Sequence, residues 1–440
     1  MNLKRSKYNI TLPLRDGNEV LLYNTLSGAF VALDKEHWSF YQNEELWPKH
    51  VSRVKLEEFK KGGFIIEDSL DELSLVSRNF MQLRYNPQVL FLTISPTTAC
   101  NFRCRYCYEQ NIPYRSMTPE DIESTIKFTN NLIDNQKPRV VNLTWFGGEP
   151  LLELDAIYRI SERLDSLWDR YQIECNVDMV TNGFHLTENV CCSLKEKTGL
   201  KSVQITVDGP KAIHDTRRPL ADGSGTFDVI LDNIREITNH VKVNLRINLD
   251  KKNLPGLSSL FEIISQRIEN KDNLRVYCSP VSTKIGQPAH LKERFSLEEY
   301  GRILVDNIFP AMIRYGLDKP ELPKPALLHC AAIGSSCFAI EPEGRIQKCL
   351  DLVGRAEEQI GKIQKDGSVA WNMPRILEWE LWSPLADESC AQCVFLPICG
   401  GGCPFSNLRL GFRECEPWKS NIYDLMELVY KNNKDKENHG

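Results

Sequence analysis

Six apolar runs separated by helix-like stretches dominate the chain between residues 89 and 280. The runs have the length of buried strands, and the stretches between them have the length of helices. Strands that alternate with helices form parallel βαβ units. We therefore expect an α/β domain whose chemistry gathers at the carboxyl ends of its strands. The strand-like runs are residues 89–95, 139–145, 173–180, 201–207, 241–248 and 274–279, and the clearest helix-like stretches are 118–134, 151–169 and 256–268.

A group of three cysteines follows the first strand-like run. Cys100, Cys104 and Cys107 have the spacing C-x3-C-x2-C. Three thiolates on one loop can hold three irons of a four-iron cluster, whereas an ordinary ferredoxin cluster uses four cysteines. The fourth iron would then be free to bind a substrate or a cofactor. A partial zinc site and a chance grouping are the alternatives that this loop alone leaves open.

This loop, with Tyr106 before its last cysteine, resembles the defining motif of the radical S-adenosylmethionine (radical SAM) enzymes. The second strand ends in Gly147-Gly148-Glu149-Pro150, which is similar to the GGEP motif of that family. The resemblance implies that Glu149 accepts a hydrogen bond from the methionyl amino group of SAM, while the glycines let the backbone approach a ligand closely. It also implies a partial (β/α)6 radical SAM barrel, a [4Fe-4S] cluster and SAM as cofactor.

The ends of later strands resemble the same family. Thr181 and Asn182 begin a TNG stretch after the third strand, and Thr206 stands where many members have serine. The resemblance implies that the Thr206 hydroxyl and Arg218 contact the ribose and the carboxylate of SAM. Arg246 is a second candidate for the carboxylate, because a guanidinium can bind it bidentately. Turn chemistry for residues 208–210 and a surface ion pair for Arg246 are the alternatives.

A second group of cysteines lies between residues 330 and 415. Its spacing resembles the SPASM domain of radical SAM peptide maturases, and its eight thiolates fit two auxiliary [4Fe-4S] clusters. If Cys337 were not a ligand, the first of these clusters would keep an open iron; paired zinc sites are the other alternative. The interleaved family pattern assigns Cys330, Cys337, Cys349 and Cys403 to one cluster and Cys390, Cys393, Cys399 and Cys415 to the other.

Composition limits the cellular context. The chain has 440 residues, a formal net charge of -5 and 15 cysteines. The charge gives no reason to expect nucleic acid or an anionic membrane as a partner. We find no apolar run long enough to span a bilayer and no secretory signal. Many cysteines without an export signal indicate a reducing, cytoplasmic location and metal ligation rather than disulfides.

The first 75 residues are predicted to form a separate unit. Strand-like runs at 8–12, 19–24 and 30–33 precede helical stretches near 35–42 and 53–61, and the segment Gly62-Gly63-Phe64-Ile65-Ile66 closes the unit. This order resembles the PqqD-like, winged-helix-like recognition element of peptide-modifying enzymes. The resemblance implies capture of a precursor's leader peptide by strand addition. A structural cap on the enzyme is the alternative.

Together these motifs predict four segments and one reaction class. We expect a recognition domain at 1–75, a linker helix at 76–88, the radical SAM barrel at 89–315 and the SPASM domain with a C-terminal helix at 316–440. The resemblance implies a radical SAM oxidoreductase that abstracts a hydrogen atom from a ribosomally made precursor peptide through the 5′-deoxyadenosyl radical. A flavodoxin- or ferredoxin-type protein would supply the electron.

The product expected is an oxidative crosslink, most readily a cysteine thioether of the sactipeptide or ranthipeptide type. A carbon–carbon crosslink, formylglycine formation as in anaerobic sulfatase maturases, and a zinc-stapled peptide-binding protein are the alternatives. Sulfatase maturases have aspartate directly after the third SPASM cysteine, whereas Leu350 follows Cys349 here and Asp351 comes one step later. Asp208 and Asp351 are the candidates for a catalytic base.

Overall fold

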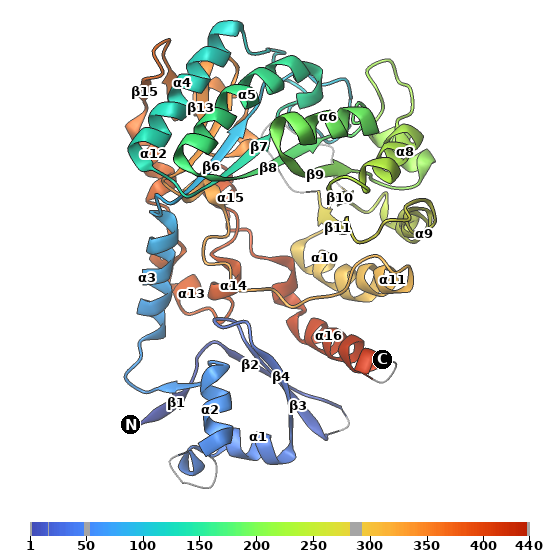
Figure 1. The fold of residues 1–440 in the computed structure, drawn as a ribbon. Helices are drawn as coiled ribbons and strands as arrows, with labels where there is room; N and C mark the ends of the chain where they lie inside the picture. The colour runs from blue at the N-terminus through green and yellow to red at the C-terminus, as the bar shows by residue number, and fades with distance from the viewer. Residues whose placement is uncertain (1, 16, 48–52, 282–292, 438–440) are drawn as a thin grey trace.

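A computed structural model describes residues 2–15, 17–47, 53–281 and 293–437. The large sheet and its helices form one end of the molecule, the N-terminal unit forms the other, and α3 (Glu72–Arg84) connects them (Figure 1). Two short helices that carry cysteines of the second group, α13 (Glu388–Ala391) and α14 (Leu396–Cys399), lie between the two ends (Figure 1). No described helix is long and apolar enough to cross a membrane.

The predicted parallel sheet is confirmed. Its six parallel strands stand in the order β11-β10-β9-β8-β7-β6, so neighbours in the chain are neighbours in the sheet. In β6, β7 and β10 the residues alternate between buried and mostly half-buried, so both faces of these strands are largely covered, which explains their apolar runs. The strands are β6 (Val89–Ile94), β7 (Val140–Trp145), β8 (Glu174–Thr181), β9 (Leu200–Thr206), β10 (Lys242–Leu249) and β11 (Leu274–Pro280).

Four further strands extend the sheet beyond β6. β12 (Cys337–Glu341) runs parallel to β6, with Cys337 opposite Phe91. β13 (Arg345–Gln347), β14 (Gly361–Ile363) and β15 (Val369–Trp371) follow in antiparallel order. The ten-stranded sheet therefore joins the predicted barrel segment to the predicted SPASM segment through backbone hydrogen bonds.

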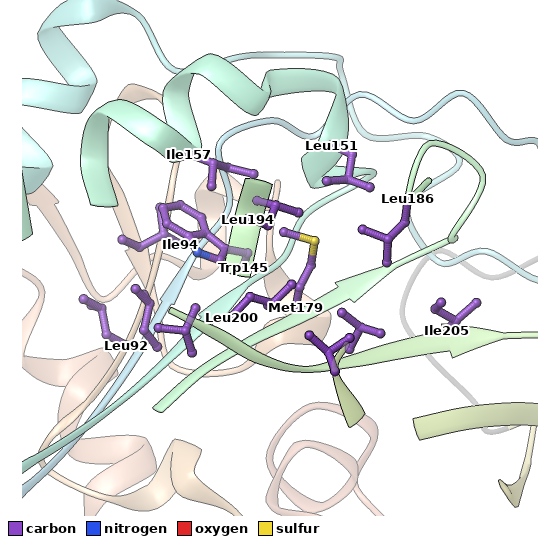
Figure 2. Packing of buried hydrophobic residues seen from close by; sticks show 14 of the residues in the cluster. Leu92, Ile94, Trp145, Leu151, Ile157, Met179, Leu186, Leu194, Leu200 and Ile205 are labelled. Atoms are coloured by element: carbon purple, nitrogen blue, oxygen red, sulfur yellow. The ribbon is translucent and has the colours of Figure 1, made fainter. Parts of the chain in front are cut away.

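Helices cover the outer face of the parallel strands (Figure 1). In Figure 2, Ile157 and Leu194 from two of these helices face Trp145 and Met179 from the strands, and all four are buried. Thr118 caps the first helix in a capping box with Asp121. The helices of this region are α4 (Pro119–Gln136), α5 (Leu154–Tyr171), α6 (Glu188–Thr198), α7 (Lys211–Arg217), α8 (Phe227–Ile237), α9 (Leu257–Arg267), α10 (Leu297–Ile303) and α11 (Phe309–Arg314).

The N-terminal unit has its own small core. Its three-stranded antiparallel sheet packs Leu22 and Leu33 against Phe40 and Phe59 of its helices. A short strand at Leu3–Arg5, which the sequence does not reveal, pairs with β5. The elements are β1 (Leu3–Arg5), β2 (Asn9–Pro13), β3 (Glu19–Asn24), β4 (Phe30–Asp34), α1 (Lys35–Gln42), α2 (Arg53–Lys61) and β5 (Ile65–Glu67).

The other face of that sheet packs on the C-terminal part of the chain. Ile10 and Leu21 share a buried cluster with Ile398, Ile422 and Met426. The N-terminal unit is therefore fixed by apolar contact, as well as by α3, to the cysteine-rich segment, by which we mean residues 373–437. The elements of this segment are α12 (Met373–Glu380), α13 (Glu388–Ala391), α14 (Leu396–Cys399), α15 (Pro404–Leu410) and α16 (Ile422–Glu437).

Candidate active site and cysteine centres

The first cysteine loop leaves β6 at the carboxyl end of the sheet, where the sequence predicts it. The Cys100 sulfur accepts a hydrogen bond from the Phe102 backbone N–H at 3.4 Å. Burial raises the pKa of Cys100 to about 12 and also raises the pKa of Cys104, which the positive charge of Arg218 opposes. Burial likewise raises the pKa of Cys107, and negative charge on Cys104 and Cys100 adds to that rise. The charge of Cys104 thus contributes to the raised pKa of both Cys100 and Cys107, which is consistent with three sulfurs on one loop.

The Gly147-Gly148 turn packs directly on this loop. Gly148 N–H donates to Thr97 O at 3.1 Å, and Glu149 N–H donates to Ala99 O at 2.9 Å. A β-carbon on Gly148 would lie 2.4 Å from Ala99 O. Only glycine allows the two backbones to approach so closely.

Glu149 is completely buried at the centre of this turn. Its carboxylate accepts hydrogen bonds from the Thr181 hydroxyl and the Asn182 N–H, both at 2.7 Å, and from the Leu151 N–H at 3.1 Å. Burial raises the pKa of Glu149, although these hydrogen bonds and the charge of Arg218 oppose the rise. The structure thus brings together three predicted site residues from two neighbouring strand ends.

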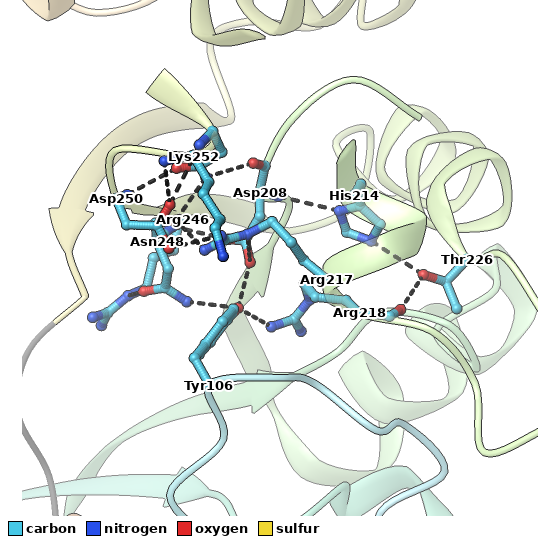
Figure 3. A network of polar contacts seen from close by, with 11 residues as sticks. Tyr106, Asp208, His214, Arg217, Arg218, Thr226, Arg246, Asn248, Asp250 and Lys252 are labelled. Atoms are coloured by element: carbon cyan, nitrogen blue, oxygen red, sulfur yellow. Dashed lines mark hydrogen bonds and ion pairs between the residues drawn. The ribbon is translucent and has the colours of Figure 1, made fainter. Parts of the chain in front are cut away.

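Tyr106 connects the cysteine loop to the ends of β9 and β10 (Figure 3). Its hydroxyl donates to Asp208 Oδ2 at 2.5 Å and accepts from Arg218 Nη1 at 2.7 Å and Asn248 Nδ2 at 3.1 Å. Burial alone would lower the pKa of Arg218, but negative charge on Cys104, Tyr106 and Asp208 outweighs burial and holds the pKa above its usual value. The predicted SAM contacts Tyr106 and Arg218 therefore belong to one buried network.

Both carboxylate oxygens of Asp208 have partners. Oδ1 accepts from the Asn248 N–H at 3.0 Å, and Oδ2 lies 3.6 Å from Arg217 Nε in addition to its bond with Tyr106. Arg217 in turn binds Asp250 at 2.7 Å. With no exposed surface, Asp208 is placed to orient the cysteine loop. Arg217 and Asn248 were missed from the sequence; the neighbouring Arg218 gave the only available signal for Arg217.

The remaining predicted SAM contacts lie around the same strand ends. Thr206 ends β9 and is 8% exposed, while Pro150 begins a short 3-10 turn. Arg246 lies on β10 and donates to Asn248 Oδ1 at 2.8 Å and to Ser279 Oγ at 3.0 Å. Arg246 is thus held by side chains of this edge and is not in a surface ion pair with any described acidic residue.

The second group of cysteines forms a clear cavity. Cys390, Cys393, Cys399 and Cys415 all line one cavity of about 80 Å³. Arg413 and Lys419 also line it; Arg413 donates to the Cys390 sulfur and Lys419 lies 3.7 Å from the Cys415 sulfur. Burial raises the pKa of Cys390 and Cys399, whereas the charge of Arg413 opposes the rise at Cys390 and so favours the thiolate, which is the form that binds metal.

The other four cysteines lie nearer the sheet. Negative charge on Cys337, Cys403 and Asp351 adds to the effect of burial in raising the pKa of Cys330 to about 12. Burial raises the pKa of Tyr108 in the first cysteine loop, and negative charge on Glu109, Asp351 and Cys349 adds to the rise. The charge of Asp351 therefore acts on both cysteine groups, at Cys330 and at Tyr108. Within the described ranges, no three Cys, His, Asp or Glu side chains converge tightly enough to ligate a single ion.

Comparison with known proteins assigns a domain to this region. Residues 94–253 match the Radical SAM superfamily. The serine-type anaerobic sulfatase-maturating enzyme of Klebsiella aerogenes is 23% identical over 345 residues, which cover 72% of this chain and 79% of that protein. The cysteine-type enzyme of Clostridium novyi (strain NT) is 26% identical over 343 residues, which cover 71% of this chain and 87% of that protein.

Two solved structures share the fold. Native anSMEcpe with bound AdoMet and Cp18Cys peptide has a TM-score of 0.55 at 18% identity and covers 80% of this chain and 100% of that chain. Streptococcus suis SuiB bound to precursor peptide SuiA has a TM-score of 0.52 at 15% identity, and the match covers 94% of this chain and 98% of that chain. The chain therefore contains a radical SAM domain, which the family match places at residues 94–253.

Proposed function

We propose that this enzyme installs an oxidative crosslink, a cysteine thioether, in a ribosomally made precursor peptide. The observation that carries the proposal is the extent of the likeness to SuiB, which was solved with a precursor peptide and covers 94% of this chain. Only about 26 residues remain unmatched, so most of the N-terminal unit lies within the match. Sulfatase-maturating relatives support formylglycine formation as the second candidate.

Three groups of thiols support three [4Fe-4S] clusters. Cys100, Cys104 and Cys107 leave one corner of a cluster without a protein ligand, while the two SPASM groups offer four thiols each. The cavity shared by Cys390 and its three partners supports one of these assignments directly. When bound, the first cluster and SAM supply the radical that removes a hydrogen atom from the peptide, and the other clusters supply an electron acceptor.

The chain's own residues bind and orient the cofactor. Glu149 is a buried carboxylate that can accept a further hydrogen bond from the SAM ammonium group, and Arg218 offers a guanidinium for its carboxylate. The Tyr106 network fixes the cysteine loop relative to β9 and β10. Because Asp208 has both oxygens engaged, we assign it a positioning role and keep Asp351, whose charge acts on both cysteine groups, as the candidate base.

Analysis of the metal content and of the product tests the function. Anaerobic reconstitution should give about twelve irons per chain, and Cys104→Ala should abolish SAM cleavage while it retains the iron of the other two centres. Co-expression with a candidate precursor should yield a peptide that, for each linkage formed, has lost two hydrogens and has one free thiol fewer. A product that instead reacts with a hydrazide as an aldehyde would establish formylglycine and overturn the crosslink.

The N-terminal sheet offers a strand edge for the leader peptide. In the described sheet, β4 stands at the edge in the order β2-β3-β4. Asn24 N–H donates to Ala29 O, so these two residues form a hydrogen-bonded pair at the end of β3. Hydrogen-bonded and non-hydrogen-bonded pairs alternate along antiparallel strands, so Leu21 and Ala32 form a non-hydrogen-bonded pair. The N–H of Ala32 therefore points away from β3. Ala32 is also exposed, so an incoming strand can reach its backbone. We infer that the leader pairs with β4, as in other cases of strand addition.

A proline at this position tests the inference with little damage to the fold. Ala32→Pro removes an outward N–H without removing a bond to β3, and proline is tolerated on edge strands in this setting. Precursor affinity should fall at least tenfold, while SAM cleavage without peptide stays unchanged. Ala32→Ser is the matched control, because it changes the side chain and keeps the N–H. Equal affinity for Ala32→Pro and the wild type would refute pairing along β4.

A further inference from the structure

Tyr8 lies where three distant segments of the chain meet. It comes directly before β2, is fully buried, and packs against Val76 of α3 and Leu396 of α14. Cys390 packs against the same cluster. The N-terminal unit thus places one aromatic side chain against Leu396 and Cys390, two residues that line the four-cysteine cavity.

The position of this ring is well fixed. Tyr8 N–H donates to Ser6 Oγ at 3.1 Å, and Tyr8 O accepts from Thr25 N–H at 3.0 Å. Glu72 secures the preceding residues by accepting from the Ser6 hydroxyl at 2.5 Å and from the Lys7 N–H at 2.9 Å. The Lys7 ammonium lies 5.0 Å from the centre of the Tyr8 ring.

The Tyr8 hydroxyl, in contrast, has no hydrogen-bond partner among the described residues. A buried polar group without a partner costs about 1–3 kcal/mol, so its retention calls for a partner. Burial raises the pKa of Tyr8, and negative charge on Glu72, Asp71 and Cys393 adds to the rise. Thr25 N–H donates to Tyr8 O, and the Thr25 hydroxyl donates to Val394 O, so Tyr8 is held close to the neighbouring Cys393, which lines the four-cysteine cavity.

We propose that the Tyr8 hydroxyl donates a hydrogen bond to a sulfur of the iron–sulfur centre held by Cys390, Cys393, Cys399 and Cys415. The proposal rests on the proposed function, which places a cluster in this cavity. Hydrogen bonds to cluster sulfurs help set reduction potentials. A donor stabilises the reduced, more negative state and raises the potential. Through this bond the N-terminal unit adjusts the reduction potential of an electron acceptor of the enzyme.

Tyr8→Phe in the full chain, reconstituted anaerobically with iron and sulfide, tests this role. The spectroscopic component to follow is the one that disappears in Cys390→Ala. We expect Tyr8→Phe to lower the reduction equilibrium constant of that component about tenfold, a fall in potential of about 59 mV for one electron. The same variant should not destabilise the metal-free protein, because it removes an unpaired buried hydroxyl.

Two controls separate the hydroxyl from the packing. Thr25 donates to Val394 O at 2.5 Å, so Thr25→Val weakens the same contact between unit and cysteine loop without removing the Tyr8 hydroxyl. Tyr41→Phe removes a hydroxyl that accepts from Asn9, within the core of the unit. Neither should move the potential. An unmoved potential in Tyr8→Phe, or an equal shift in Thr25→Val, overturns this role and leaves the proposed function intact. Stoichiometric zinc in the Cys390 cavity would overturn both.

Discussion

Substitution of Gly148 by alanine gives the sharpest test of how the cysteine loop is held. The new β-carbon would lie 2.4 Å from Ala99 O, 2.6 Å from Ala99 C and 2.6 Å from Thr98 O. These are backbone atoms of the segment that leads into Cys100, so no side chain can rotate away. The turn and the loop must separate by about 1 Å to reach ordinary van der Waals contact, which strains two buried backbones.

The expected cost follows from this geometry. Overpacking a well-packed core costs about 1–3 kcal/mol. Because the clash is between backbones and strains two connecting hydrogen bonds, we expect the upper end, about 3 kcal/mol. At about 2–4 °C per kcal/mol for a cooperative unit of 150–250 residues, the Tm of the metal-free protein should fall by about 6–12 °C. Displacement of Cys100 should also remove about a third of the iron bound after reconstitution.

Gly199→Ala is the matched control. Gly199 has a φ of +69° at the end of α6, and no atom lies within 4 Å of the place that an added methyl group would occupy. A left-handed alanine costs about 1–2 kcal/mol without disturbing any neighbour, so the Tm should fall less and the iron content should stay at the wild-type value. If Gly148→Ala retains both the wild-type Tm and the full iron content, the close backbone contact does not hold the loop.

Three further substitutions probe other parts of the fold. Glu149→Gln should weaken SAM binding about tenfold or more in equilibrium dialysis, because a charged acceptor is lost; unchanged affinity would contradict the assigned role. Lys348→Met leaves the Glu380 carboxylate without its buried partner at 2.8 Å and should cost about 2–3 kcal/mol in thermal denaturation; adding Glu380→Gln should recover part of the loss, and no recovery would argue against the pair. Thr118→Ala should cost about 1 kcal/mol by removing the capping box, whereas a neutral effect would show that the cap contributes nothing.

The sequence predicts the parallel strands well because each contributes a long apolar run that packs under the helices. It does not reveal β1 and β13–β15, which are three residues long. Such short strands carry no periodic signal, and only their partners in the fold determine their pairing. The continuation of the sheet through β12 depends on contacts between residues about 245 positions apart, such as Cys337 and Phe91.

The candidate site divides in the same way. Motif residues such as Glu149 and Tyr106 could be named from the sequence because their spacing after strands is diagnostic. Their partners could not, because Asn248 and Arg217 reach Tyr106 and Asp208 only once β9 and β10 lie side by side. The same limit applies to Tyr8, whose neighbours Val76 and Leu396 are brought to it by the fold.

The packing of the N-terminal unit also determines how its function can be tested. Removal of residues 1–75 would expose Ile398, Ile422 and Met426, which are buried against Ile10 and Leu21. At about 1.5–3 kcal/mol for each large apolar side chain transferred to water, such a truncation destabilises the cysteine-rich segment. Loss of precursor binding after truncation would therefore not distinguish a missing recognition edge from a disordered metal centre. A backbone substitution at the exposed β4 edge, in contrast, removes the recognition edge and keeps the metal centre ordered. It therefore tests peptide capture alone.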